Sequence, residues 1–225
     1  MVVYADGADI ETMRSLLDNP VVQGFTTNPS LLTKAGVTDY RDFAKQVLEV
    51  IGDMPVSFEV LSDDFTEMER QAIQISNWGP NVWVKIPITN TQGKSSGNLI
   101  EKLADDGVKV NVTAVMTTGQ IRTAIKSLGD SEGIISIFAG RIADTGKSPT
   151  SYIQYAASRK GHKSKILWAS TREVYNYIQA EHACGDIITM SPELIAKLSG
   201  IGADRAEVSL ATVRQFFEAG KGYSL

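Results

Sequence analysis

The sequence contains very few of the residues that build disulfide frameworks and zinc sites. Among its 225 residues there is one cysteine, Cys184, and there are only two histidines, His162 and His182. A single cysteine cannot form an intrachain disulfide, and these three residues cannot supply a Cys/His cluster with zinc-site spacing. We therefore expect a protein of the reducing cytoplasm, without disulfides and without a bound metal ion.

Positive charge and long apolar stretches are also scarce. The chain has 26 acidic and 22 basic side chains, which gives a formal net charge of −4. This balance disfavours binding to nucleic acid or to an anionic membrane surface, although a local anion site is compatible with it. No window approaches the roughly 18 consecutive apolar residues of a membrane-spanning helix. We expect neither nucleic-acid nor membrane partners.

The sequence does have a series of short apolar runs rich in β-branched and aromatic residues. They lie at residues 2–6, 24–28, 56–60, 82–87, 108–115, 134–141, 165–170 and 186–190. The runs are almost continuously apolar, as strands covered on both faces should be. Between them lie stretches with helical spacing. In residues 39–51, for example, Phe43, Val47 and Ile51 fall on one helical face. The pattern predicts parallel β/α units.

Eight such units predict an α/β fold, namely a single (β/α)8 TIM barrel domain over residues 1–225, slightly compact against the usual length of about 250 residues. An open doubly wound sheet is the alternative. It would normally carry a G-x-G-x-x-G loop after the first strand, and residues 5–9 contain none. A further helix is expected at about residues 204–219. Its adjacent Phe216 and Phe217 could close the bottom of the barrel or pack on a neighbouring subunit.

Polar side chains occur at the ends of most of these predicted strands, where such barrels keep their active sites. In strand order they are Asp6; Thr26, Thr27 and Asn28; Glu59; Lys85; Asn111 and Thr113; Ser136 and Arg141; and Ser170 with Arg172. Only the last strand, with Thr189 and Met190, looks plain. Asp6, Glu59 and Lys85 are informative as a set, because charged groups inside apolar strands are costly unless they are paired or functional.

Lys85 is the most suggestive of these residues. By strand alternation it shares a face with Trp83 and Pro87, which predicts that it points into the barrel. A lysine withdrawn from water loses its proton more easily and, as a neutral amine, can form a Schiff base with a carbonyl substrate. The alternative is a buried ion pair with a glutamate or an aspartate.

The other candidates also have two interpretations. Asp6 and Glu59 could divide acid and base work, although Asp6 could instead cap a helix that starts near Asp9. Arg141 and Arg172 extend beyond strand ends, where they could bind a phosphate ester or form solvated salt bridges. The polar groups at the remaining strand ends could be no more than hydrogen-bonded core or loop residues: Asn28, Asn111, Thr113 and Ser136.

Several strings at these positions resemble the transaldolase family. They are Gly24–Leu31 (GFTTNPSL), Val84–Pro87 (VKIP), Val110–Val115 (VNVTAV), Ser136–Ile142 (SIFAGRI) and Ala169–Arg172 (ASTR). In length the chain is similar to the small subfamily, which also contains fructose-6-phosphate aldolases. The resemblance runs from the first predicted strand to the C-terminal tail, and the TTNPS string together with the strand lysine is its most specific part.

The resemblance implies a role for each of these residues. Lys85 would form an imine with the carbonyl carbon of a ketose phosphate, and Asp6 would deprotonate the C4 hydroxyl so that the C3–C4 bond breaks. Glu59, with Thr113, would hold and activate the water used to form and break the carbinolamine. The substrate-binding residues would be Thr27, Asn28, Asn111 and Ser136, which contact the donor, and Arg141, Ser170 and Arg172, which bind its phosphate.

Two positions favour transfer of the three-carbon unit over its release. Within this family, transaldolases typically carry glutamate as the water residue and phenylalanine after the serine of the sixth strand, whereas the aldolases carry glutamine and tyrosine. Here these residues are Glu59 and Phe138. Without a phenol near the enamine, the intermediate has one proton donor fewer and should survive until an acceptor arrives. The runner-up is an aldolase that uses free dihydroxyacetone.

The resemblance also implies partners and setting. It implies sugar phosphates such as fructose 6-phosphate or sedoheptulose 7-phosphate as donors, no cofactor, a place in the pentose phosphate pathway and a homo-oligomer, often a pentamer or decamer. The two arginines would also accept a sulfonate, so a sulfosugar donor is a further alternative. From a different class comes a non-catalytic phosphosugar-binding barrel, in which Lys85 and Glu59 are merely a buried pair.

Overall fold

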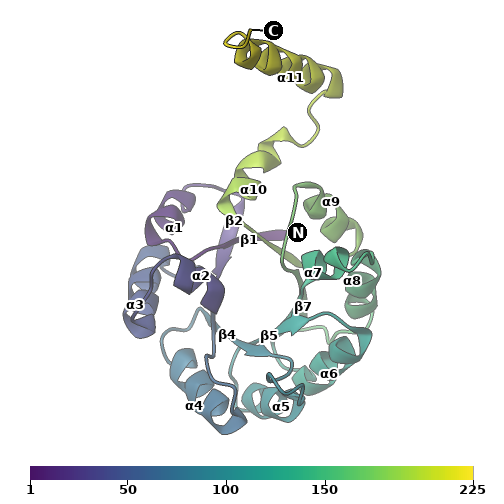
Figure 1. Ribbon diagram of the computed structural model, residues 1–225. Coiled ribbons are helices and arrows are strands. Elements are labelled where there is room, and N and C mark those ends of the chain that lie inside the picture. Colours follow the sequence, from purple (N-terminus) through teal and green to yellow (C-terminus); the bar gives the residue numbers. More distant parts are fainter. Residues whose placement is uncertain (225) are drawn as a thin grey trace. The chain divides into compact units, whose positions relative to one another are not determined.

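The computed structural model describes residues 1–224 and contains the predicted barrel (Figure 1). Eight parallel strands close into a ring in the order β1 to β8, and β8 pairs with β1. The strands are β1 (Val2–Asp6), β2 (Val22–Thr26), β3 (Val56–Glu59), β4 (Val82–Pro87), β5 (Val110–Val115), β6 (Gly133–Ile137), β7 (Ser164–Trp168) and β8 (Ile187–Met190). The (β/α)8 fold class is confirmed.

Helices alternate with the strands, and those between β1 and β8 surround the ring (Figure 1). The helices of residues 1–224 are α1 (Ile10–Leu16), α2 (Pro29–Lys34), α3 (Tyr40–Ile51), α4 (Phe65–Ser76), α5 (Gly97–Asp105), α6 (Thr118–Leu128), α7 (Ala139–Asp144), α8 (Thr150–Ala157), α9 (Tyr175–His182), α10 (Pro192–Ala196), the 3-10 helix η1 (Lys197–Gly200) and α11 (Arg205–Gly220). The chain divides into two compact units, Met1–Ile195 and the residues from Ala196 onward. Within residues 1–224, no helix combines the length and the apolar character that crossing a membrane requires.

Helix α11, in the second unit, is the predicted C-terminal helix. Asp204 caps it by accepting hydrogen bonds from the N–H groups of Ala206 and Glu207. Its large apolar side chains are exposed, Phe216 at 69% and Phe217 at 67%. Packing of this helix on a neighbouring subunit, the homo-oligomer and the interpretation of residues 1–225 as one domain stay predictions.

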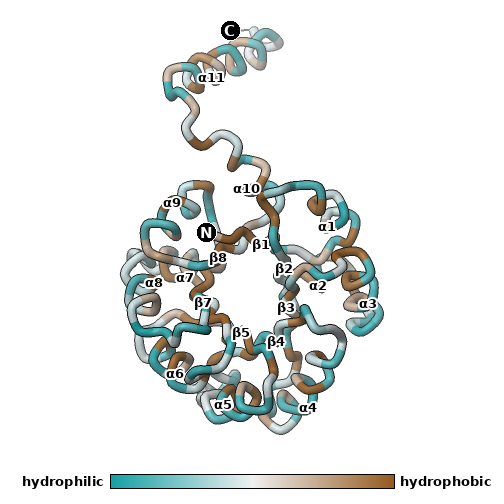
Figure 2. The backbone as a smooth tube through the Cα atoms, turned by 180° about the vertical axis from the view of Figure 1, so that it is seen from behind, coloured by the Kyte–Doolittle hydropathy of each residue, from teal (hydrophilic) through white to brown (hydrophobic). Residues whose placement is uncertain are grey.

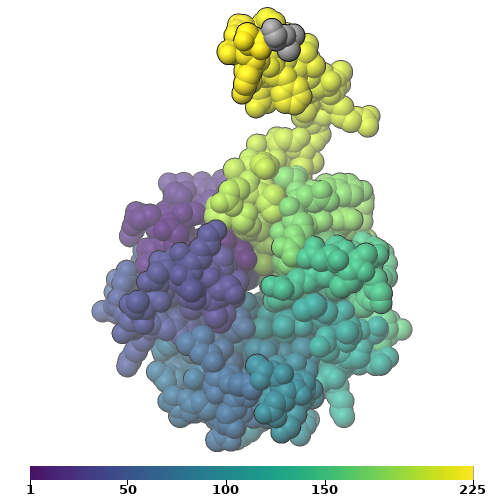
Figure 3. Space-filling view, viewed as in Figure 1, coloured from purple at the N-terminus to yellow at the C-terminus, as the bar shows by residue number. Residues whose placement is uncertain are grey.

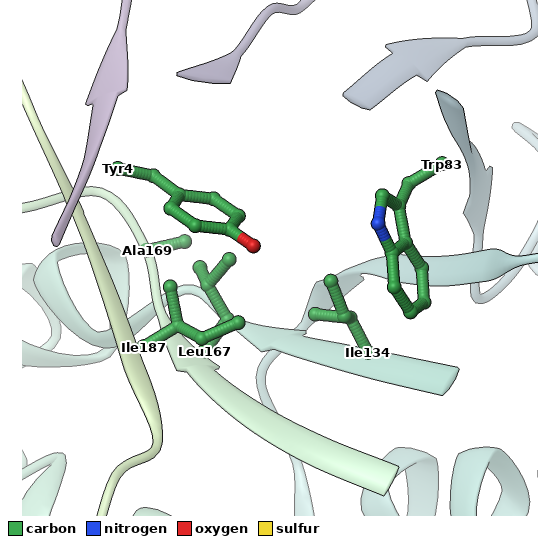
Figure 4. Close-up of a cluster of buried hydrophobic side chains, with 6 residues drawn as sticks. All are labelled: Tyr4, Trp83, Ile134, Leu167, Ala169 and Ile187. Carbon is green, nitrogen blue, oxygen red and sulfur yellow. The ribbon is translucent and has the colours of Figure 1, made fainter. Parts of the chain in front are cut away.

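Apolar side chains fill the inside of the barrel (Figure 4). Tyr4 of β1 and Trp83 of β4 lie on opposite sides of a buried cluster that also contains Ile134, Leu167 and Ile187. Hydrophobic residues follow β1, β7 and β8 in Figure 2. In the space-filling view, atoms cover most of the ring that the ribbon leaves open (Figure 3). On the same strands, Asp6 and Lys85 follow Tyr4 and Trp83 by two residues, so these charged groups lie above the apolar cluster toward the C-terminal ends.

The helices pack on the barrel through the apolar faces that the sequence predicts. In α3, Phe43, Val47 and Ile51 are buried, and burial of each contributes roughly 1.5–3 kcal/mol. Asp39 caps the start of this helix by accepting a hydrogen bond from the N–H of Asp42. Gly52 ends it with a φ of 58°, a conformation that favours glycine.

Four predicted strands end earlier than expected, namely β2, β3, β6 and β7. Strand β6 stops before the expected end, and Arg141 therefore lies in α7 rather than in a strand. Strand β2 ends at Thr26, because the side chain of Asn28 accepts a hydrogen bond from the N–H of Leu31 and caps α2. After β2 the sequence does mark the boundary, because Asn28 is the N-cap and Pro29 the first residue of α2. After β6 it does not, because Phe138 at the start of α7 makes no side-chain cap hydrogen bond.

Candidate active site

Lys85 points into the barrel, as strand alternation predicts. It is 5% exposed, and the register of β3 and β4 sets it beside Glu59. Its Nζ lies 3.1 Å from Glu59 Oε2 and donates a hydrogen bond to the carbonyl oxygen of Thr27 at 2.8 Å. The buried ion pair considered as an alternative is therefore present. The same contact gives the amine a carboxylate that can take its proton, so pairing and catalysis are compatible.

Asp6 ends β1 and faces the same region. Its carboxylate accepts a hydrogen bond from Thr26 Oγ1 at 2.8 Å, and Thr26 is in turn hydrogen-bonded to Thr189 of β8. Burial raises the pKa of the Asp6 carboxyl, although the positive charge of Lys85 and the Thr26 hydrogen bond oppose this rise, and the negative charge of Glu59 adds to it. The charged groups of β1, β3 and β4 thus influence one another electrostatically.

The structure corrects two interpretations at this end of the barrel. Asp6 does not cap α1; Asp9 does, by accepting a hydrogen bond from the N–H of Thr12 at 2.7 Å. The eighth strand is not plain, because Thr189 supports the hydroxyl that contacts Asp6. Its position two residues after the inward-facing Ile187 was the signal that could have identified it.

A belt of buried polar side chains crosses β3, β5 and β6. Asn111 donates from Nδ2 to Ser57 Oγ at 3.0 Å, and Ser136 Oγ donates to Asn111 Oδ1 at 2.7 Å. The sequence analysis missed Ser57, although it lies two residues before Glu59 on the same strand face. Thr113 Oγ1 is buried and has no hydrogen-bond partner among residues 1–224, so this hydroxyl is available to a ligand.

A cavity of about 200 Å³ opens at this end of the barrel. It is lined by most of the predicted site residues: Asp6, Asn28, Lys85, Thr113, Ser136, Phe138, Arg141, Ser170 and Arg172. The other predicted residues lie behind this wall. Glu59 contacts Lys85, Thr27 provides the carbonyl group for its amine, and Asn111 holds Ser136. Residues from strands far apart in the sequence therefore meet at one small cavity.

The two arginines approach the cavity from α7, which holds Arg141, and from the segment after β7, which holds Arg172. Arg172 donates to Asp144 Oδ2 at 2.6 Å, with both side chains about half exposed, so the salt-bridge interpretation holds for this residue. A Cβ on Gly140 would lie 1.7 Å from the carbonyl oxygen of Ser170, which shows that α7 touches the segment after β7. Ser170 has a φ of 62°, a strained conformation for a residue other than glycine. Such strain is common at functional sites.

Comparison with known proteins identifies the class of barrel. Residues 3–224 match the family described as transaldolase/fructose-6-phosphate aldolase. The chain belongs to this family. A "probable transaldolase" of Dehalococcoides mccartyi is 31% identical over 201 residues, which cover 88% of this chain and 90% of that protein. A "probable transaldolase" of Streptococcus equi subsp. zooepidemicus is 33% identical over 202 residues, with the same two coverages.

Two solved structures with much lower sequence identity share the fold. 3-Hexulose-6-phosphate synthase from Salmonella typhimurium aligns with a TM-score of 0.60 and 13% identity, covering 85% of this chain and 89% of that one. A putative phosphonomutase from Burkholderia cenocepacia aligns with a TM-score of 0.56 and 12% identity, covering 95% and 93%. At such low identity, these similarities show the barrel alone.

Membership of the transaldolase/fructose-6-phosphate aldolase family gives this chain a transaldolase-like function. Within residues 1–224, no three side chains of His, Cys, Asp or Glu are grouped so as to hold a metal ion. The amine of Lys85 and the carboxylate of Asp6 line the cavity, and the carboxylate of Glu59 contacts the amine from behind this wall. Their arrangement allows proton transfer to and from an amine beside a small cavity.

Proposed function

We propose that this protein is a transaldolase that moves a dihydroxyacetone unit from a ketose phosphate to an aldose phosphate through an imine on Lys85. The observation that carries the proposal is the environment of the lysine. Its Nζ is withdrawn from water, lies 3.1 Å from the Glu59 carboxylate and lines the same cavity as Asp6. A nucleophilic amine with a proton acceptor in contact and a second carboxylate nearby is the set that class I aldol chemistry requires.

The first half of the reaction attaches the donor to the protein. Glu59 takes a proton from the Lys85 ammonium, and the neutral amine adds to C2 of the ketose. A proton then passes from the nitrogen to the former carbonyl oxygen. Glu59 returns its own proton to that hydroxyl, which leaves as water, and a protonated imine remains on Lys85. Thr113, whose buried hydroxyl has no partner among the described residues, would hold this water.

The second half breaks and remakes a carbon–carbon bond. Asp6 takes the proton of the C4 hydroxyl, the C3–C4 bond breaks, and its electron pair forms the enamine while the aldehyde leaves. The enamine carbon then attacks the carbonyl carbon of an aldose acceptor, and Asp6 returns the proton to the new hydroxyl. Hydrolysis of the imine, again with Glu59, releases the product. Because Phe138 lines the cavity without a hydroxyl, it cannot protonate the enamine, which favours transfer over release.

Arg141, Ser170 and Arg172 would bind the phosphate of the donor, which is supported by the fact that all three line the cavity. A guanidinium group can form two parallel hydrogen bonds to a phosphate. For Arg172 this requires an exchange of partners, because its guanidinium group is hydrogen-bonded to Asp144. Binding energy from this remote group would position the reacting carbons over Lys85.

Product analysis with fructose 6-phosphate, with and without erythrose 4-phosphate, tests the proposal. We expect sedoheptulose 7-phosphate and glyceraldehyde 3-phosphate when the acceptor is present, and no sustained cleavage without it. Steady release of free dihydroxyacetone without acceptor would show that the protein is an aldolase and not a transaldolase. Turnover of sulfofructose but not of fructose 6-phosphate would show that the donor is a sulfosugar and not a ketose phosphate. Binding of ketose phosphates without turnover would identify a non-catalytic binding barrel.

A further inference from the structure

Glu59 is the last residue of β3 and lies beyond the end of the neighbouring strand β2. In a parallel ladder, alternate residues direct their N–H and C=O groups toward opposite neighbours. The N–H of Val60 donates to the carbonyl of Lys85 on β4, whereas the carbonyl of Ser57 accepts from the N–H of Thr27 on the β2 side. Glu59, two residues after Ser57, therefore directs its backbone groups toward the β2 side. Strand β2 has ended at this level, so it offers them no ladder partner.

The side chain of Tyr40, from α3, takes the place of the missing strand. Its hydroxyl donates to the carbonyl oxygen of Glu59 at 3.0 Å and accepts from the N–H of the same residue at 2.8 Å. Its ring packs edge-on against Trp78 and Phe58, with centroids 5.5 and 6.1 Å away. Burial raises the pKa of the Tyr40 phenol, so the hydroxyl keeps the proton that it donates.

One side-chain oxygen thus fixes both backbone groups of the residue whose carboxylate contacts Lys85. We propose that Tyr40 is a positioning residue, which holds the end of β3 so that Glu59 stays within reach of Lys85 Nζ. This inference rests on the proposed function, in which Glu59 moves the protons of imine formation. A purely structural role, in which the phenol only satisfies two backbone groups, makes a different prediction for kinetics.

The test removes the hydroxyl with Tyr40→Phe, which keeps the ring and its contacts. Imine formation is followed by quenching a mixture of protein and fructose 6-phosphate with borohydride at successive times and measuring the modified fraction by mass spectrometry. We expect a rate lower by about 10- to 100-fold, the range that a displacement of about 1 Å can cause. KM should change less than about twofold, because the proposed phosphate-binding side chains lie in α7 and in the segment after β7, away from the end of β3. Tyr4→Phe, which removes another buried phenol, should leave the rate unchanged.

A double-mutant cycle with Glu59→Gln separates positioning from structure. If Tyr40 acts through the Glu59 carboxylate, Tyr40→Phe should change the rate less than about twofold once that carboxylate is replaced. Independent, multiplicative effects would overturn the inference, as would a wild-type rate in Tyr40→Phe. Failure of Tyr40→Phe to fold at 25 °C would also overturn it, because the hydroxyl would then be structural. Absence of any borohydride adduct in the unmodified protein would instead refute the proposed function itself.

Discussion

The contact between Gly140 and Ser170 provides a sharp test of how the cavity is built. Replacing Gly140 with alanine puts a Cβ 1.7 Å from the carbonyl oxygen of Ser170 and also 3.0 Å from Arg172 Nε. The first distance is about half of an ordinary non-bonded contact of about 3.5 Å. The added methyl group and the carbonyl group of Ser170 therefore cannot both keep their positions. Either α7 or the segment after β7 must move, and each carries an arginine of the proposed phosphate site.

The expected magnitude follows from two opposing effects. A helical Gly→Ala change with room for the methyl group stabilises a protein by about 0.4–1 kcal/mol, whereas overpacking costs about 1–3 kcal/mol or more. We therefore expect Gly140→Ala to lower the free energy of unfolding. The matched control is Gly119→Ala in α6, where the nearest atom to the new Cβ is 3.8 Å away. That variant should be at least as stable as the original protein.

Urea unfolding followed by circular dichroism measures both variants. In kinetics, Gly140→Ala should raise KM for fructose 6-phosphate by roughly tenfold or more, since losing one charged hydrogen bond costs about 1.5–3 kcal/mol. KM for a ketose without phosphate should change much less. Equal stability of Gly140→Ala and Gly119→Ala, with unchanged KM for the phosphorylated donor, would refute the reasoning.

Three further variants probe the remaining groups. Asp6→Asn should abolish activity but stabilise the protein at neutral pH, because burial raises the pKa of Asp6 above its ordinary value of 3.8 and ionised Asp6 therefore opposes folding. This gain, read from urea unfolding, should vanish as the pH falls below 3.8, where the carboxyl is protonated in both states; a gain independent of pH would contradict it. Phe138→Tyr should raise the ratio of free dihydroxyacetone to transfer product, measured by chromatography. An unchanged ratio would refute the idea that the missing phenol favours transfer. Thr113→Val should stabilise the protein by about 1 kcal/mol, because it removes a buried hydroxyl without a partner, yet slow imine formation; a variant with the original imine rate would exclude Thr113 from the water step.

The sequence predicts the centre of this site well because strand geometry is regular. Side chains alternate with a period of two, so the apolar neighbours of Lys85 suffice to direct it inward. Parallel neighbours in near-aligned register then bring Glu59 beside it and Asn111 on its other side. These contacts follow from the order of the strands and from the positions of polar residues within them.

Contacts that depend on where a strand stops, or that come from a helix, were not predictable in this way. Tyr40 reaches Glu59 only because β2 ends before β3 does. Arg141 was expected in a strand and lies in α7, and the pairing of Arg172 with Asp144 depends on how that helix approaches β7. Local pattern sets the period of an element but fixes its ends poorly, since caps and close backbone contacts decide them.

The most direct test of the central claim is the location of the covalent adduct. An active preparation is reduced with borohydride in the presence of fructose 6-phosphate, digested and mapped by mass spectrometry. The account predicts a dihydroxyacetone- or ketose-derived mass on the peptide that contains Lys85 and on no other, and no adduct in Lys85→Ala. An active protein whose Lys85 stays unmodified, or a Lys85→Ala variant that still transfers the three-carbon unit, would contradict it.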